Sequence, residues 1–492
     1  MSATDDAASA PLSMGKLQQT VDSGHVDTVL VAFTDMQGRL QGKRVHAKHF
    51  LEEVMQHGTE ACNYLLAVDV DMNTVGGYQI SSWDLGYGDF VLRPDMSTLR
   101  AAPWWPATAM VQCDLTWLDG TPVRQSPRQV LRAQVERAAT MGCVALAGTE
   151  LEFMIFEGSY EEAWDRGYRN MTPATRYNVD YSVLGTSRVE GLLRDIRNAM
   201  YNAGLSVESA KGECNHGQHE IAFKYAEVLR TADQHAVYKT AAKELAVRHG
   251  RSLTFMAKYD EREGNSCHIH MSLRGLDGSL VFIEDDPVEP GKRSRFFTSF
   301  VAGILATLPD FTLLYAPNVN SYKRFQPGTF APTAIAWGED NRTCALRVVG
   351  NGSSLRVENR VPGGDINPYL GLAAMLAGGL WGIQSNLVLG PSVPGNAYLL
   401  ETGPVPTRLR QITELGITTP PPSWTAETLK VDALSVPTTL RDARDLFAGS
   451  MIARSVFGDD VVDHYVNMAD VELAAHESAV SDWERFRGFE RL

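Results

Sequence analysis

Four short segments of the chain carry side chains that could bind metal ions and phosphate groups. They are Glu150-Leu151-Glu152, Glu213 with Glu220, His268-Ile269-His270, and Arg356-Val357-Glu358-Asn359-Arg360. Residues two apart on a β-strand point to the same face, so each strand segment would present its charged side chains together. Carboxylates are costly to crowd or bury unless a cation balances them. We interpret the five glutamates and one histidine as ligands for two divalent ions.

The neighbouring arginines add a second chemistry, because guanidinium groups bind phosphate and carboxylate oxygens in pairs. Metal ions together with arginines are what metal-assisted phosphoryl transfer requires. Each motif alone has a plainer explanation: a solvated strand face, a core histidine with satisfied hydrogen bonds, or a ladder of surface charges. Their order and contexts, taken together, favour a catalytic site.

Length and composition indicate a soluble globular protein of two or more domains. The chain has 492 residues, of which 44% are hydrophobic and 21% charged. A net charge of −14 argues against nucleic acid as a partner. The longest apolar run, residues 371–383, is too short to cross a membrane and predicts a buried helix. Six scattered cysteines without a CxxC pair indicate reduced thiols and a cytoplasmic location.

The apolar patterning predicts the elements that would position these residues. Residues 26–33, 43–47, 91–95 and 109–114 indicate strands, 51–57 a short helix, and 76–89 a long loop. After the breaker-rich segment 119–127, helices are expected at 128–141, 189–203 and 234–249. Strands are expected at 145–156, 253–258, 268–273 and 345–349. The prediction is an α+β protein with a disordered tail (1–24), a small β-rich domain (25–122) and a large catalytic α/β domain (123–492), in which a curved antiparallel sheet lines a cleft.

From about Val26 onward the chain resembles the glutamine synthetase family, class I-like. The matching segments are GTELEFMIF (148–156), KGECNHGQHEIAF (211–223), CHIHMSL (267–273), NSYKRFQPG (320–328), NRTCALR (341–347) and RVENRVPGGDINPYLGLAAML (356–376). The resemblance implies an N-terminal β-grasp domain and ATP-dependent joining of ammonia to glutamate through γ-glutamyl phosphate. It also implies a ring-shaped homo-oligomer, usually a dodecamer, with active sites between subunits.

The resemblance also implies a role for individual residues. One metal site would be Glu152, Glu213 and Glu220, and the other Glu150, His268 and Glu358, with Mg²⁺ or Mn²⁺ suited to the oxygen ligands. Arg342 and Arg347 would lie near the γ-phosphate of ATP. Arg324, Arg360 and the backbone of Gly264 would hold glutamate, and both arginines the reacting phosphoryl group. Tyr225, His270, Ser272 and Arg356 match nucleotide-side positions.

Several departures from the family pattern concern the nitrogen donor. Ammonia-using members carry a glutamate in a PGYEAP loop that closes the site and helps bind and deprotonate ammonium. Here residues 327–332 read PGTFAP, and Phe330 replaces that glutamate. The usual DGSS segment is also missing, and Asp71 lies roughly where its aspartate is expected. An adenine-side lysine becomes Ser353, and the loop before His268 carries Glu263.

We therefore interpret the chain as keeping glutamate activation while rebuilding the ammonium pocket. The segments MQGRLQGKR (36–44) and SSWDLGYGDF (81–90) are most similar to the γ-glutamylethanolamide synthetases of actinobacteria. The hypothesis is a ligase for a small primary amine such as ethanolamine, with Phe330 and Asp71 in the amine pocket and Asp71 or Glu263 assisting deprotonation. The alternatives are a γ-glutamylpolyamine synthetase, a true glutamine synthetase and a catalytically silent structural oligomer. Tyr398 lies near a tyrosine that some glutamine synthetases adenylylate, but in a different context that indicates an ordinary loop residue.

Overall fold

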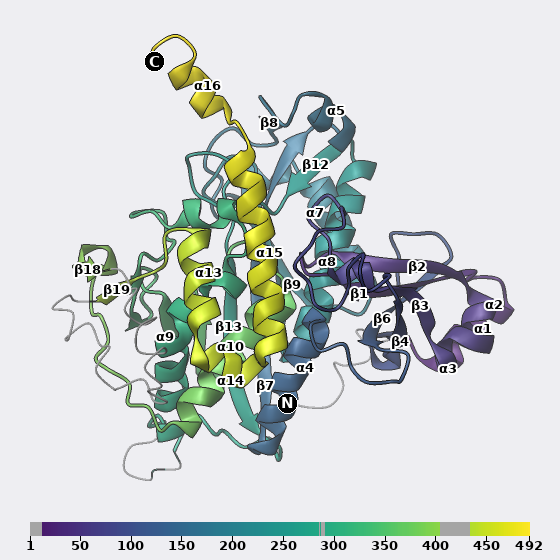
Figure 1. Ribbon diagram of the computed structural model, residues 1–492, viewed down its shortest axis with the longest axis horizontal. Helices are drawn as coiled ribbons and strands as arrows, with labels where there is room; N and C mark the ends of the chain where they lie inside the picture. The colour runs from purple at the N-terminus through teal and green to yellow at the C-terminus, as the bar shows by residue number, and fades with distance from the viewer. Residues whose placement is uncertain (1–11, 285, 287–290, 404–432) are drawn as a thin grey trace.

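The computed structural model of the protein describes residues 12–284, 286, 291–403 and 433–492. A small sheet of six strands forms the N-terminal part of these residues and lies to one side of the body in Figure 1. Its order is β2-β1-β6-β4-β3, with β5 on β6, and only β1 and β6 run parallel. The strands are β1 Thr28–Thr34, β2 Leu40–His46, β3 Thr59–Cys62, β4 Asp89–Pro94, β5 Arg100–Ala101 and β6 Thr108–Thr116.

The large sheet has ten strands in the described part of the chain, and β7 is its organising strand. The order is β15-β16-β17-β13-β7-β10-β9, and β8, β11 and β12 also pair with β7. All pairs are antiparallel except β15 with β16. The strands are β7 Cys143–Glu157, β8 Thr172–Pro173, β9 Val207–Gly212, β10 Gln218–Phe223, β11 Ala226–Glu227, β12 Arg251–Thr254, β13 Cys267–Gly275, β15 Trp337–Glu339, β16 Leu346–Val349 and β17 Arg356–Asn359. A minor sheet contains β14 Ala334–Ile335, β18 Thr402–Gly403 and β19 Ala433–Ser435.

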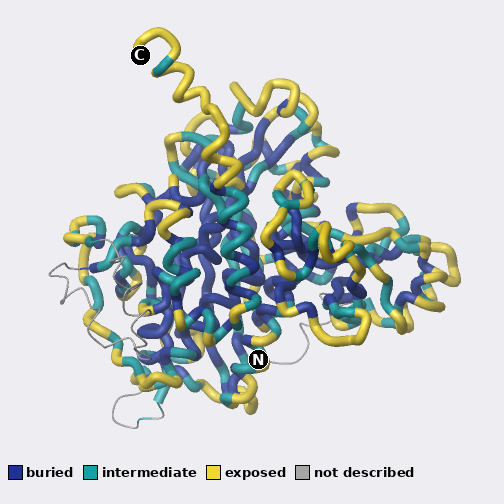
Figure 2. The backbone as a smooth tube through the Cα atoms, in the orientation of Figure 1, coloured by how far each residue is buried: buried dark blue, intermediate teal, exposed yellow. Residues whose placement is uncertain are grey.

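Helices such as α4 (Pro127–Thr140) and α8 (Val228–Arg248) pack against the large sheet. The buried residues gather in the dark central region of Figure 2. The longer helices are α4 Pro127–Thr140, α7 Glu190–Asn202, α8 Val228–Arg248, α9 Arg295–Tyr315, α10 Pro368–Gln384, α13 Leu440–Gly449 and α15 Asp459–Ser478. The shorter ones are α2 Ala47–His49, α3 Met55–His57, α5 Tyr160–Asp165, α6 Val183–Ser187, α14 Met451–Phe457 and α16 Asp482–Gly488. The strand predicted at 253–258 is β12, which begins two residues earlier and already ends at Thr254.

Helices α9 and α10 form the apolar centre of the large unit. The run predicted to be a buried helix lies in α10, which is buried along nearly its whole length. The two helices can approach closely because Gly303 has no side chain. A Cβ at this position would lie only 2.3 Å from the carbonyl oxygen of Gly378. By length and composition α9 alone, among the described residues, is apolar enough to cross a membrane, but 78% of its most apolar window is buried inside the protein. That burial is typical of a core helix.

The prediction of a disordered tail over residues 1–24 is wrong for its second half; residues 1–11 lie outside the described part. Helix α1 spans Met14–Asp22, and the Ser13 side chain caps it by accepting a hydrogen bond from the backbone of Lys16. Leu17 and Val21, four residues apart, are both buried in the core. Two apolar residues at helical spacing are therefore enough to anchor a segment whose overall composition is polar.

A buried ion network joins the small sheet to the helices of the large unit. The guanidinium of Arg128, on α4, lies 2.7 Å from a carboxylate oxygen of Asp95, 2.7 Å from one of Asp114 and 2.9 Å from one of Asp233. Asp95 and Asp114 belong to the N-terminal part and Asp233 to α8. Since Arg128 is only 2% exposed, the two parts are held by charges that water barely screens.

Candidate active site

Strand β7 positions two glutamates on the face of the large sheet that carries the charged cluster. Glu150 pairs in register with His268 on β13, and Glu152 pairs with Glu220 on β10. One strand further out, His270 pairs with Glu358 on β17. The period of two along each strand and the cross-strand register together bring these residues to one face.

The first group consists of Glu152, Glu213 and Glu220, whose carboxylate oxygens lie within 4.8 Å of one another. Glu152 and Glu220 are buried. Burial, reinforced by the charge of Glu213, raises the pKa of Glu152, and burial followed by the charge of Glu150 raises the pKa of Glu220. Lys211 forms an ion pair with Glu213 and offsets part of this repulsion. A group of three crowded carboxylates favours any cation that can enter it.

The second group is built around Glu150 and Glu358. Oxygens of both carboxylates and a nitrogen of His270 lie within 4.8 Å of one another. The Nε2 atom of His270 is 2.9 Å from Glu150 Oε1, and the Nδ1 atom of His268 is 3.4 Å from Glu150 Oε2 and 3.6 Å from Glu358 Oε1. Both histidines thus contact Glu150, whereas the sequence assigned only His268 to this group.

Glu358 differs from the first group because arginines compensate its charge. Its side chain is fully buried, and burial alone would raise its pKa, but His268 and Arg360 reverse the effect and lower it to about 2. Arg347 lies 2.8 Å from Glu358 Oε2, and Arg360 forms an ion pair with Oε1. Burial also lowers the pKa of His268, to about 4. His268 is therefore a neutral imidazole and Glu358 an ionised carboxylate at neutral pH, and these are the protonation states in which the two side chains can bind a metal.

The donors of the two groups fit divalent ions that prefer oxygen ligands, such as Mg²⁺ or Mn²⁺. All six residues predicted as ligands lie together in these two groups. Gln218 also belongs to this site but was not predicted from the sequence; its side-chain amide donates to Glu152 Oε2 at 3.0 Å and to the carbonyl of Gly264 at 3.0 Å. Its place two residues before Glu220 on β10, on the same strand face, could have indicated it.

Beside the second group lies a cavity of about 370 Å³. Four of its lining residues, Tyr225, His270, Ser272 and Arg356, are those predicted to face a nucleotide. The Nε atom of Arg356 lies 3.2 Å from His270 Nδ1, which connects this cavity to Glu150. Arg274 also lines the cavity and hydrogen-bonds the backbone carbonyl of Ser353. Arg274 was not predicted from the sequence, although it lies two residues after Ser272 on the same face of β13.

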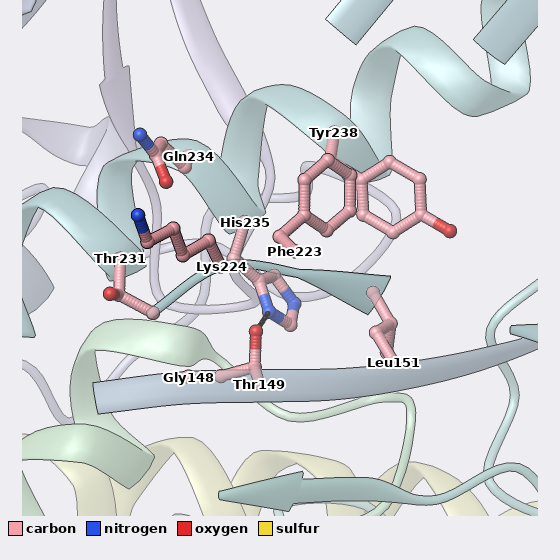
Figure 3. Close-up of a pocket in the computed structure, with 9 residues that line it drawn as sticks. All are labelled: Gly148, Thr149, Leu151, Phe223, Lys224, Thr231, Gln234, His235 and Tyr238. Carbon is pink, nitrogen blue, oxygen red and sulfur yellow. Dashed lines mark hydrogen bonds between the residues drawn. The ribbon is translucent and has the colours of Figure 1, made fainter. Parts of the chain in front are cut away.

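A much smaller pocket lies between β7 and α8 (Figure 3). In Figure 3 the ring of His235 lies over Thr149, and its Nδ1 atom is 3.1 Å from Thr149 Oγ1. The volume is about 10 Å³, enough for roughly one water molecule. His235 Nε2 and the hydroxyl of Tyr238 are buried there without a protein partner. This pocket is too small for a substrate, and its contacts support the strand that carries Glu150.

Comparison with known proteins identifies the family to which the chain belongs. The model of the glutamine synthetase catalytic domain matches residues 124–416 and 419–487. The chain belongs to the glutamine synthetase family. Its relatives in that family include glutamine synthetases and glutamate–amine ligases, and the protein is, like them, an ATP-dependent carbon–nitrogen ligase.

Two relatives within the family are especially informative. The chain is 58% identical over 482 residues to a gamma-glutamylethanolamide synthetase of Streptomyces coelicolor, covering 98% of this chain and 96% of the relative. It is 35% identical over 474 residues to a glutamate–isopropylamine ligase of a Pseudomonas species, covering 96% and 97%. A solved structure of GmaS with ADP superimposes with a TM-score of 0.79 at 25% identity, covering 97% of this chain and all of that one. The glutamine synthetase fold expected from the sequence is confirmed.

The buried arginines of this glutamine synthetase fold lie near the two candidate metal-binding groups, Arg360 beside Glu358 and Arg324 beside Glu152. Arg324 is 1% exposed, and its guanidinium donates to the carbonyl of Val361 at 2.9 Å and to Ser266 Oγ at 3.0 Å. A Cβ on Gly264 would lie 2.6 Å from Cγ of Arg324 and 2.2 Å from the carbonyl oxygen of Ala257, so only glycine fits there. Arg360, also buried, donates to the carbonyl of Arg342 at 3.1 Å.

The residues predicted for the amine pocket occupy three different places. Phe330 lies in the loop after Arg324, is 53% exposed and has a positive φ of 57°. Glu263 lies in the loop before β13, where its backbone carbonyl accepts a hydrogen bond from Asn215. Asp71 lies in a turn capped by the carboxylate of Asp69. Within the described residues, no hydrogen bond or ion pair connects Asp71 to the candidate metal-binding groups of its own chain.

Proposed function

We propose that this protein joins a small primary amine, best represented by ethanolamine, to the γ-carboxyl group of L-glutamate, using ATP and a γ-glutamyl phosphate intermediate. The observation that carries the proposal is Phe330, which lies in residues 327–332, here called the acceptor loop. This segment resembles the loop in which ammonia-using members of the family carry a glutamate. The ethanolamide and isopropylamine ligases among the relatives support an alkylamine acceptor.

The first step activates glutamate. The buried guanidinium groups of Arg324 and Arg360, with the backbone of Gly264, would hold the amino acid so that a γ-carboxylate oxygen faces the γ-phosphorus of ATP. That oxygen forms the new bond to phosphorus while ADP leaves. Tyr225, Ser272 and Arg356 would hold the nucleotide in the larger cavity, and Arg342 and Arg347 would neutralise the transferred group.

The carboxylate groups have a separate part in this step. Glu152, Glu213 and Glu220 would hold one divalent ion, and Glu150, Glu358 and His268 the other, with His270 within reach of Glu150. When bound, such ions neutralise the phosphoryl oxygens and help to align donor and acceptor. The raised pKa values of Glu152 and Glu220 support this assignment, because they result first from burial and then from repulsion between carboxylates, and a bound cation would offset both effects.

The second step makes the amide. The nitrogen lone pair of the neutral amine attacks the acyl carbon, phosphate leaves, and the extra proton of the nitrogen passes to a nearby base, for which Asp71 of a neighbouring subunit or Glu263 is our candidate. An alkylamine has a pKa of about 10, so only about one molecule in a thousand is neutral at pH 7. The rate is therefore expected to rise toward alkaline pH.

Phe330 provides the discrimination between an alkylamine and ammonium. Ammonium is strongly hydrated and needs hydrogen-bond acceptors where it is desolvated, which a phenyl ring supplies poorly. An alkyl chain gains about 0.8 kcal/mol for each buried CH₂ group, so two carbons give roughly 1.6 kcal/mol or about fifteenfold in affinity.

The test is a phosphate-release assay with ethanolamine, isopropylamine, putrescine and ammonium as acceptors. We expect kcat/KM for a small alkylamine to exceed that for ammonium, and Phe330→Glu to narrow the difference. Wild-type enzyme that makes glutamine from ammonium with a higher kcat/KM than it shows for any alkylamine would overturn the proposal. Putrescine as the best acceptor would support a polyamine ligase instead.

We also propose a cytoplasmic ring-shaped homo-oligomer, expected to be a dodecamer, in which residues 25–122 form a domain that completes a neighbour's active site through Asp71. Mixing the inactive variants Asp71→Ala and Glu152→Ala under conditions of subunit exchange should restore activity, because some shared sites then contain both native residues. A fully active monomer in analytical ultracentrifugation would contradict this arrangement.

A further inference from the structure

The backbone of the acceptor loop is strained at Phe330. Its φ of 57° lies in the left-handed region, which is unfavourable for a residue with a side chain. A strained residue persists only where its surroundings hold it, and such residues are often found at functional sites. The contacts that hold Phe330 therefore identify the groups that decide where its ring lies.

Two side chains hold this part of the loop by its backbone carbonyls. Arg360 donates from Nη2 to the carbonyl of Phe330 at 3.4 Å, and the hydroxyl of Tyr398 donates to the carbonyl of Ala331 at 3.0 Å. The second bond is the shorter and better formed. Burial raises the pKa of Tyr398, which keeps its hydroxyl protonated and able to donate.

The segment that carries Tyr398 is fixed independently of the acceptor loop. The side-chain amide of Asn341 donates to the carbonyl of Gly395 at 2.7 Å, and the backbone N–H of Ala397 donates to Thr343 Oγ1 at 2.9 Å. Ala397 also packs against buried Cys344. Tyr398 thus bridges two loops: one contains Phe330, and the other contains Arg342, predicted to bind the γ-phosphate.

We propose that Tyr398 is a positioning residue for acceptor selectivity. Through its hydrogen bond to Ala331 it holds the left-handed conformation of Phe330, and it connects the acceptor loop to the loop that carries Arg342. This inference rests on the proposed function, since it explains how the phenyl ring is held in the amine pocket.

The test compares Tyr398→Phe with Tyr160→Phe. Tyr160 is a matched control because its hydroxyl donates to the carbonyl of Leu253 at 2.8 Å, away from the acceptor loop. Loss of one such hydrogen bond corresponds to a change of about fivefold in kcat/KM. We expect Tyr398→Phe to lower the ratio of kcat/KM for the amine to that for ammonium by about fivefold, while KM for ATP stays within twofold. Tyr160→Phe should leave that ratio unchanged.

A second variant separates positioning from general damage to the fold. In a Phe330→Ala background the ring is absent, so adding Tyr398→Phe should not change the acceptor ratio further. An additive loss in the double variant would overturn the inference, as would an unchanged ratio in Tyr398→Phe when the wild type discriminates between the acceptors. A wild type that shows no preference for alkylamines would instead refute the proposed function, because there would be no selectivity for Tyr398 to control.

Discussion

Glu152 and Glu358 are both expected to be essential for turnover, yet their removal should have opposite effects on the stability of the metal-free enzyme. In Glu358→Gln the buried guanidinium group of Arg360 and the partly buried one of Arg347 lose their shared carboxylate. Breaking a buried ion pair in this way costs about 3–5 kcal/mol. Glu358→Gln should therefore unfold more easily.

Glu152→Gln should have the reverse effect. Burial and the charge of Glu213 raise the pKa of Glu152, so at neutral pH the folded state must either protonate this carboxyl or keep it ionised, and both cost free energy relative to the unfolded state. A rise of even one unit corresponds to about 1.4 kcal/mol. The isosteric amide keeps an oxygen that can accept from the backbone N–H of Ser266, now 2.7 Å from Glu152 Oε2. We expect stabilisation of at least about 1 kcal/mol, and therefore a separation of at least about 4 kcal/mol between the two variants.

The assay is urea unfolding of EDTA-treated enzyme at pH 7.5, together with ligase activity in excess Mg²⁺. Glu157→Gln is the control, because Glu157 lies on the same strand but its ion pair with Arg251 is partly exposed and should contribute under 1 kcal/mol. Adding Mg²⁺ should stabilise the wild type more than either variant. The reasoning is refuted if both variants shift the unfolding midpoint in the same direction, or if either keeps near wild-type activity.

Three further predictions follow from particular contacts. Gly264→Ala should raise KM for glutamate at least tenfold in steady-state assays, because the new methyl group displaces Arg324; an unchanged KM would contradict this. Arg128→Met should lower the free energy of unfolding by about 3–5 kcal/mol in urea titrations, with Arg128→Lys intermediate, because three carboxylates lose their guanidinium partner. Burial lowers the pKa of His235 and His464 from 6.5 to about 3, so below pH 6.5 only the unfolded state takes up their protons and stability falls. At pH 5 each of these histidines should lower the free energy of unfolding by about 2 kcal/mol. His464→Gln should therefore reduce the decline of Tm that calorimetry measures between pH 7.5 and 5.

Much of the candidate site could be predicted from the sequence because it depends on local patterns. The period of two on a strand places Glu150 and Glu152 on one face whatever lies around them, and the antiparallel pairing confirms it. The apolar run 371–383 likewise predicted the buried helix α10, since a segment that is apolar on all sides must be covered. The polar composition of residues 1–24 led to a wrong prediction of disorder at α1, where Leu17 and Val21 anchor an otherwise polar segment.

Other features depend on contacts between residues far apart in the chain, and only the tertiary structure decides them. No pattern in GNAY reveals that Tyr398 donates to Ala331, 67 residues away, or that Phe330 has a left-handed backbone. The sequence contains both histidines of the HIH segment but cannot show that both contact Glu150, because that depends on the register between β7 and β13. Residue types and their local spacing thus determined the chemistry available to this protein, whereas the packing of loops against one another determined which groups hold the acceptor loop.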